Sequence, residues 1–440
     1  MSLLERVREH ERTTGAEHSE EPSLAVVRER LKRDLVGRLG LSVVASMAAE
    51  EDASAARNEI AVACESILNT GDYEALDAAD RDRLIDQVLD EICGLGPIQS
   101  LLEDPTISEV MVNGCDHIFF ERAGELHPSD RAFDSAEQIM LVIDRILAPL
   151  GRRLDQASPI VNARLANGDR VNAVAQPVAM NGPALTIRKF SHEVMSLDAL
   201  VALGSVPTWY ATLLGWAVRT RQDIAVAGGT GSGKTTLLNA LSLEIGLDER
   251  IITIEDSAEL KFDAHPNVVR LEARDASIEG TGAVTIRDLV KNALRMRPDR
   301  IVVGEVRSEE AIDMLQAMNT GHDGSLTTLH AGATEEVVPR LVLMSRFGMD
   351  LPTEIIEEQV ATALDLIVMS RRMGDGRRYL STLSEVGRAP GGGVKLQECV
   401  RFDEARRSWE LVREPAFVGR CVLEGTLDAE EVGQWRSLLT

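Results

Sequence analysis

The sequence predicts an α/β protein whose main domain holds a mostly parallel sheet, preceded by a small α+β domain and a helical N-terminal region. Three successive patterns along the 440 residues support this division. Apolar side chains have helical spacing in residues 23–95, short apolar–polar strands occupy residues 96–195, and helices alternate with strongly apolar strands in residues 196–386. Strand–helix alternation of the last kind indicates a parallel sheet with helices on both faces.

The helical region follows a polar segment, residues 1–22, that we expect to form a flexible tail. In its last part, apolar residues recur at the spacing of one helix face. These residues are Leu84, Ile85, Val88, Leu89 and Ile92. The sequence Gly-Leu-Gly-Pro at residues 94–97 then breaks the helical pattern, so the next domain begins there.

The α+β domain is predicted from short strands bounded by turn residues. Its expected elements are a helix at 134–148 and strands at 109–114, 118–121, 161–165, 170–175 and 185–188. In the main domain, the expected strands are 223–227, 250–254, 300–304 and 325–329. A helix is expected to begin at Thr285, because Asp288 stands in the capping-box position. The Gly-rich residues 387–393 are expected to separate a C-terminal extension, residues 387–440.

Composition narrows the possible functions. The chain has 47 Lys and Arg against 71 Asp and Glu, a net charge of −24, whereas neutralising nucleic-acid phosphates requires a basic surplus. Its five cysteines form no CxxC pair, which argues against a zinc site or a disulfide scaffold and fits a reducing compartment. Because the sequence shows neither a signal-peptide pattern nor a run of about 18 apolar residues, we expect neither cleaved export nor a membrane span.

One segment matches the phosphate-binding loop (P-loop) motif G-x-x-x-x-G-K-[ST], between an apolar strand and a helix. Its glycines would let backbone N–H groups curl around phosphates, and the helix would direct its free N–H groups at the anion. We expect Lys234 to contact β- and γ-phosphate oxygens and the Thr235 hydroxyl to bind Mg²⁺. The predicted nucleotide-binding residues are Gly228, Gly229, Thr230, Gly231, Ser232, Gly233, Lys234, Thr235 and Thr236.

Acidic residues follow two other apolar strands. Glu255 and Asp256 come after one strand, and Glu305 ends another. Ligands of open parallel sheets bind at the carboxyl ends of strands, so these acids and the P-loop should share one edge. Hydrolysis of a γ-phosphate needs a carboxylate beside the metal and a group that orients the attacking water. Both roles are therefore available in this sequence.

Two histidines, His322 and His330, flank the short strand expected at residues 325–329. A histidine there could couple a γ-phosphate to the next element, and a purely structural role stays equally open. Neither histidine has Cys or His neighbours at metal-ligand spacing, so we expect no metal site at them.

In their order, these motifs resemble those of type II/type IV secretion-system ATPases, and within that superfamily the CpaF-like branch of tight-adherence (Tad) pilus machines. The resemblance covers roughly residues 84–386. It rests on segments that include SPIVNARLANGDRVNAV, ALTIRKF, GGTGSGKTT, ITIEDSAEL, MRPDRIVVGEVRSEEAID and DLIVMSRR. The sequence departs from the family pattern at Asn162 and Asn167, where acids are expected, and at Ser308, where glycine is usual.

The resemblance implies a homo-hexamer of RecA-like P-loop domains that hydrolyses ATP with Mg²⁺. Such a motor acts on inner-membrane platform proteins of a pilus or secretion machine, which implies a cytoplasmic chain held at the inner membrane through partners. The family's Walker B motif falls on residues 301–305, with Gly304 where most P-loop enzymes have Asp, and its His box ends at His330. Arginines of its N-terminal domain reach phosphate, and by motif position the candidates are Arg170 and Arg188.

The spacing from Lys234 to Glu255 resembles that to the water-activating glutamate of RecA-like enzymes, which assigns Glu255 to the water and Glu305 to Mg²⁺. The reverse assignment stays open. Two other functions also stay open: a conjugative ATPase that handles DNA or protein, and a nucleotide-gated scaffold without turnover. The acidic charge and the lack of aromatic residues interleaved with basic ones count against nucleic acid as a partner.

Overall fold

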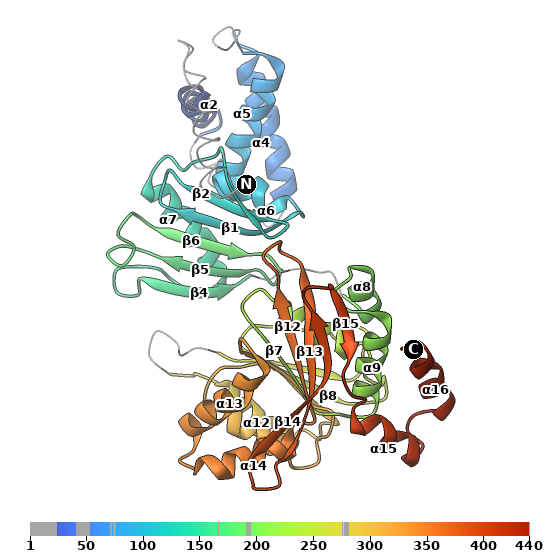
Figure 1. The fold of residues 1–440 in the computed structure, drawn as a ribbon. Helices are drawn as coiled ribbons and strands as arrows, with labels where there is room; N and C mark the ends of the chain where they lie inside the picture. Colours follow the sequence, from blue (N-terminus) through green and yellow to red (C-terminus); the bar gives the residue numbers. More distant parts are fainter. Residues whose placement is uncertain are drawn as a thin grey trace. The chain divides into compact units, whose positions relative to one another are not determined.

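The computed structural model describes residues 24–40, 53–70, 73, 76–165, 167–190, 195–274, 276 and 281–439. The chain divides into two compact units, residues 1–191 and 192–440, and most of their helices and strands are labelled in Figure 1. The predicted flexible tail, residues 1–22, lies outside the described residues. Among the helices of the described ranges, none is both long and apolar enough to cross a membrane.

Within the described residues, the N-terminal unit begins with the helices α2 (Leu24–Leu39), α4 (Ala53–Leu68) and α5 (Ala78–Cys93). Helix α5 begins at Asp77, whose side chain accepts a hydrogen bond from the Asp80 N–H. Its predicted apolar face is confirmed, because Leu84, Val88 and Leu89 are buried among the three helices and the other two predicted residues are partly buried there.

An antiparallel sheet of six strands completes this unit, in the order β3-β2-β1-β6-β5-β4. Its strands are β1 (Ile107–Asn113), β2 (Ile118–Arg122), β3 (Glu125–Pro128), β4 (Ile160–Arg164), β5 (Arg170–Val174) and β6 (Ala184–Arg188). Its helical segments are η2 (Gly96–Ile98), α6 (Gln99–Glu103), α7 (Ala136–Leu147) and η3 (Ala148–Leu150). The apolar face of α7, which includes Ile139 and Ile143, packs with the sheet in one core. The five predicted strands and the helix are present, and β3 is an addition.

The second unit contains a nine-stranded sheet in the order β15-β14-β13-β12-β7-β11-β10-β8-β9. Its strands are β7 (Ile224–Gly228), β8 (Ile251–Glu255), β9 (Val268–Glu272), β10 (Arg300–Val306), β11 (Leu326–His330), β12 (Leu366–Arg372), β13 (Arg378–Arg388), β14 (Val394–Asp403) and β15 (Ser408–Leu411). The six strands from β12 to β9 are parallel, and β13 to β15 add antiparallel strands at one edge.

Helices cover both faces of this sheet. They are α8 (Leu197–Ala202), α9 (Thr208–Arg219), α10 (Lys234–Ser242), α11 (Ile286–Ala293), α12 (Glu310–Met318), α13 (Thr334–Gly348), α14 (Thr353–Ala363), α15 (Ala416–Glu424) and α16 (Ala429–Ser437). Successive strand residues alternate between two cores: Val226 and Val302 pack on one face, Ala225 and Val303 on the other. The predicted RecA-like α/β class, with a mostly parallel sheet preceded along the chain by an α+β domain and helices, is confirmed.

The C-terminal residues belong to the same sheet and core. The Gly-rich residues 387–393, expected to separate an extension, instead lie at the turn between the paired strands β13 and β14. On α16, the Trp435 ring packs edge-on against Trp216 with centroids 5.3 Å apart, and its Nε1–H donates to the Trp209 carbonyl at 2.7 Å. The sheet therefore continues past residue 387, and α16 packs in the hydrophobic core on one face of the sheet.

Candidate functional site

The P-loop joins the end of β7 to the start of α10, as the motif predicts. Gly228 ends β7, Lys234 opens α10, and Thr235 and Thr236 lie half-buried in the first helical turn. Gly231 and Gly233 have φ of +70° and +96°, which glycine adopts without steric cost. The loop lies between two neighbouring strands, because Gly228 is in register with His330 of β11 and with Ser370 of β12.

Lys234 is buried at the base of this loop, with 8% of its surface exposed. Its ammonium donates to the carbonyls of Gly229, at 3.0 Å, and Gly228, at 3.3 Å. Burial lowers the pKa of Lys234, and the nearby Glu305 carboxylate partly offsets this effect. The lysine is thus held by neutral carbonyls in a position that a phosphate could compete for.

His330 connects Lys234 to Glu305. Its Nδ1 lies 3.4 Å from the Lys234 ammonium, and its Nε2 lies 2.7 Å from Glu305 Oε1. In a neutral imidazole with its hydrogen on Nε2, Nδ1 can accept from the Lys234 ammonium. The contact of Nε2 with Glu305 Oε1 is close but is not aligned as a hydrogen bond, and Oε1 has no hydrogen-bond partner within the described residues. Burial and the Lys234 charge lower the pKa of His330, which favours this neutral form. His330 therefore lies between the P-loop lysine and the acid that ends the Walker B segment.

Arg307 extends this chain of contacts and was not among the predicted site residues. Its Nε donates to Glu305 Oε2 at 2.8 Å, and its Nη1 to Asp256 Oδ2 at 3.1 Å. Arg307 thus joins Asp256, which follows β8, to Glu305, which lies near the end of β10. The signal in the sequence was its place two residues after Glu305, but its second partner lies 51 positions away.

Glu255 lies at the end of β8, beside β10, and only 3% of its surface is exposed. Its Oε2 accepts hydrogen bonds from the backbone N–H groups of Glu259, at 2.6 Å, and Leu260, at 2.8 Å. Its Oε1 is buried and has no hydrogen-bond partner within the described residues. Burial raises the pKa of Glu255 to about 7, although the two N–H donors act to lower it. A carboxylate with this pKa can accept a proton near neutral pH.

The other predicted residues lie apart from these contacts. His322 lies before β11, so it adjoins the end of the strand opposite to His330, and its Nδ1 is 3.1 Å from the Ala317 carbonyl. Arg170 and Arg188 belong to the N-terminal unit, where they face each other across the β5–β6 pair. The structure thus brings these two arginines together, and their contact with a nucleotide stays a prediction.

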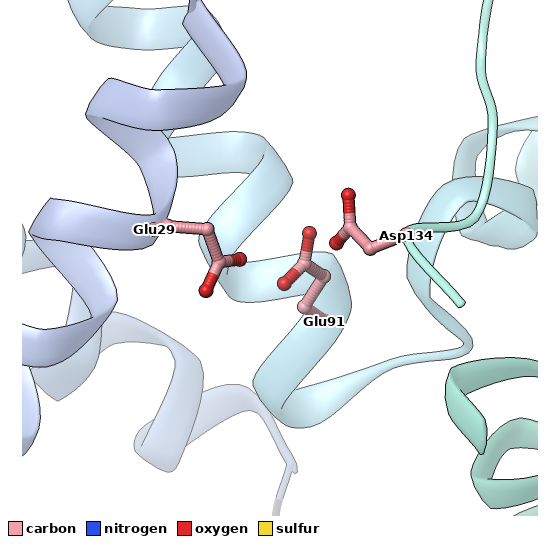
Figure 2. A group of neighbouring side chains, drawn as sticks. All are labelled: Glu29, Glu91 and Asp134. Carbon is pink, nitrogen blue, oxygen red and sulfur yellow. The ribbon is translucent and has the colours of Figure 1, made fainter.

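A cluster of carboxylates in the N-terminal unit is paired with basic side chains. Figure 2 shows Glu29 of α2, Glu91 of α5 and Asp134, which precedes α7, converging. Arg28 and Lys32 supply the counter-charge: the Arg28 Nε lies 3.0 Å from Glu91, the Lys32 ammonium lies 2.6 Å from it, and the two cations also pair with Asp134 and Glu29, respectively. The cluster is an ion-pair network that ties α2 to its neighbours.

Known proteins of secretion and conjugal transfer systems are similar to this chain over most of its length. A protein of Mycobacterium tuberculosis, provisionally named as a conjugal transfer protein, is 38% identical over 307 residues, 68% of this chain and 87% of that protein. The type IV secretion system protein VirB11 of Brucella suis is 34% identical over 302 residues, 62% of this chain and 83% of that protein. The crystal structure of the Brucella suis VirB11 ATPase with sulphate is 31% identical, covers 66% of this chain and 95% of that one, and has a TM-score of 0.37.

A family model described as type II/IV secretion system protein matches residues 91–379. This range contains the P-loop, both strand-terminal glutamates and His330, and it also includes all strands of the six-stranded sheet. The chain therefore belongs to the family of type II/IV secretion system proteins.

Proposed function

We propose that the chain is an ATP-hydrolysing motor subunit that powers assembly of a Tad or type IV-like pilus, or type II/IV secretion, at the inner membrane. One observation carries this proposal. The buried P-loop lysine, Lys234, is connected through His330 to Glu305, and Glu255, with a pKa of about 7, lies on the neighbouring strand. A phosphate anchor and two acids beside it are what ATP hydrolysis requires.

The residues present fit Mg²⁺ beside the phosphates. This ion prefers oxygen ligands, and the Thr235 hydroxyl and the Glu305 carboxylate are oxygen donors near the loop. When bound, the ion would neutralise charge that develops on the transferred phosphoryl group. Glu305 is paired with His330 and Arg307 in this structure. For Glu305 to bind Mg²⁺, these two residues would share the carboxylate with the ion or move away from it. Glu255 would then accept the proton of the attacking water.

The proposal is tested by phosphate release from purified full-length protein with Mg²⁺ and ATP. We expect turnover by the wild-type chain and none by Lys234→Ala. The variant should keep its circular dichroism spectrum, because the lysine bonds only to loop carbonyls and approaches His330. Turnover that survives in Lys234→Ala would contradict the P-loop assignment, and a wild-type chain that binds ATP without turnover would support a nucleotide-gated scaffold.

We further propose a homo-hexamer that binds inner-membrane platform proteins from the cytoplasmic side. Arg170 and Arg188 would contact phosphate once the ring closes, where they would offset developing charge. Native mass spectrometry with and without nucleotide tests the ring, and a pull-down against inner-membrane proteins tests the partner. The identity of the captured proteins also separates a Tad pilus from other secretion machines.

A conjugative ATPase that handles DNA or protein is the second candidate, favoured by the conjugal-transfer name of the Mycobacterium relative. The net charge of −24 counts against a DNA-binding role. Fluorescence anisotropy with labelled single-stranded DNA tests whether the chain handles DNA. Affinity that falls steeply with salt would support DNA handling, whereas absence of binding at low salt would leave the pilus or secretion motor.

A further inference from the structure

The antiparallel hairpin of β12 and β13 lies close to the P-loop, on the side of β7 away from β11. A Cβ atom on Gly228 would lie 2.2 Å from the Ser370 carbonyl oxygen, so the two backbones approach as closely as glycine permits. The Ser370 hydroxyl also donates to the Ser232 carbonyl at 2.6 Å. The hairpin is therefore fixed to the loop at two points.

A third contact brings a charge to the loop. Arg378, the first residue of β13, is exposed, and its Nε donates to the Gly231 carbonyl at 2.9 Å. Its Cδ would lie 3.2 Å from a Cβ atom on Gly233, so the side chain runs along the loop. Directly across the strand pair is Arg372, whose Nη1 would lie 3.6 Å from a Cβ atom on Gly231. Arg372 and Arg378 are therefore in register beside the P-loop.

Arg378 differs from its neighbours in its partners. Arg377 lies 3.6 Å from Asp375, and Arg371 lies 3.0 Å from Glu404. Within the described part of the chain, Arg378 forms no ion pair, and its hydrogen bond goes to a neutral carbonyl. In a protein with a net charge of −24, a cation without an acidic partner beside a phosphate-binding loop points to a ligand that is itself an anion.

We propose that Arg378 binds the phosphate chain of a nucleoside triphosphate on the P-loop, from the β12–β13 hairpin. This inference rests on the proposed nucleotide site. Nε keeps its bond to the Gly231 carbonyl, and the two Nη groups provide the remaining donors in a planar fork that matches phosphate oxygens. Lys234 and Arg378 then act on the phosphates from two different elements of one chain.

The test is titration of the full-length protein with a fluorescent ATP analogue and Mg²⁺. Arg378→Gln keeps an N–H donor for the Gly231 carbonyl but removes the charge, and we expect it to raise Kd about tenfold or more. Arg378→Lys keeps the charge but loses the planar fork, so it should bind more weakly than wild type and more tightly than Arg378→Gln. The matched control is Arg377→Ala, at the residue that precedes Arg378, and this variant should bind the ATP analogue as tightly as wild type does. Circular dichroism melts check that the exposed substitutions leave the fold intact.

Two results would overturn the inference. If Arg378→Gln binds as wild type does, Arg378 only holds the loop. If the Gln and Lys variants lose affinity equally, the positive charge at position 378 does not contribute to nucleotide binding. A wild-type chain that binds no nucleotide is a separate outcome, because it removes the proposed function itself rather than the role of Arg378 alone.

Discussion

Glu255 fills the space in which any residue other than glycine at position 304 would place its side chain. A Cβ atom on Gly304 would lie 2.9 Å from the Glu255 Cγ and 3.6 Å from its Cβ. The two residues are neighbours because β8 and β10 pair in parallel, with Ile254 opposite Val303. The glycine in the Walker B segment is thus a condition for the buried position of Glu255.

We therefore expect Gly304→Ala to displace Glu255 and lower kcat for ATP hydrolysis at least tenfold, because even a misplacement of about 1 Å is costly in catalysis. Nucleotide affinity should change little, since the P-loop is untouched. Steady-state phosphate release and an ATP-analogue titration measure the two effects. The control is Gly387→Ala, where a Cβ atom would meet nothing within 4 Å. An unchanged kcat in Gly304→Ala would show that Glu255 need not keep this position.

The roles of Glu255 and Glu305 can be distinguished by mutant kinetics and by the pH dependence of turnover. A base must be deprotonated, so kcat of the wild type should rise with pH around the Glu255 pKa of about 7. Glu255→Gln should abolish turnover and leave Mg²⁺·ATP binding intact, whereas Glu305→Gln should weaken the Mg²⁺ dependence of binding. The assignment is wrong if Glu305→Gln stops turnover with Mg²⁺·ATP still bound and Glu255→Gln abolishes metal binding.

The fully buried Arg300 should be important for stability. It forms a bidentate pair with Glu249, at 2.7 and 2.9 Å, and donates to the Gly324 carbonyl at 3.2 Å. Arg300→Ala leaves a buried carboxylate without this partner and should lower the free energy of unfolding by about 3–5 kcal/mol. Arg221 contacts the same Glu249 at 2.9 Å from a half-exposed position, so Arg221→Ala should cost less than about 1 kcal/mol. Urea titration followed by circular dichroism compares the two, and equal losses would contradict this account.

A buried acid should make stability depend on pH. Burial, together with the neighbouring Asp365, raises the pKa of Asp223 to about 9, while its Oδ1 accepts from the Ser325 N–H at 2.8 Å. An unfolded chain releases this proton near pH 4, so the contribution of Asp223 to stability declines as pH rises from about 4 to 9. Asp223→Asn should therefore gain stability over wild type, by roughly 1 kcal/mol or more, with the gain growing between pH 5 and 9. Thermal melts of Asp223→Asn and wild type across this range test it, and a gain that does not change with pH would contradict this account.

Features fixed by neighbouring residues could be predicted from the sequence. The capping box of Thr285 and Asp288 and the passage from β7 through the P-loop to α10 depend on a few adjacent positions. The contacts of Arg307 and Arg378 could not be predicted in this way, because their partners lie 51 and 147 positions away. The strands β13 to β15 were missed for a related reason: a Gly-rich turn looks like a linker until the pairing of β13 with β14 is known.

The four tryptophans of the chain are Trp209, Trp216, Trp409 and Trp435, and all of them lie in the second unit. Intrinsic indole emission is consequently an optical signal of the P-loop unit alone, with no contribution from residues 1–191. Because Trp216 and Trp435 are in contact, detachment of α16 from the unit would expose both rings to water and shift this emission to longer wavelengths. Detachment of the C-terminal segment can thus be followed in the unlabelled protein.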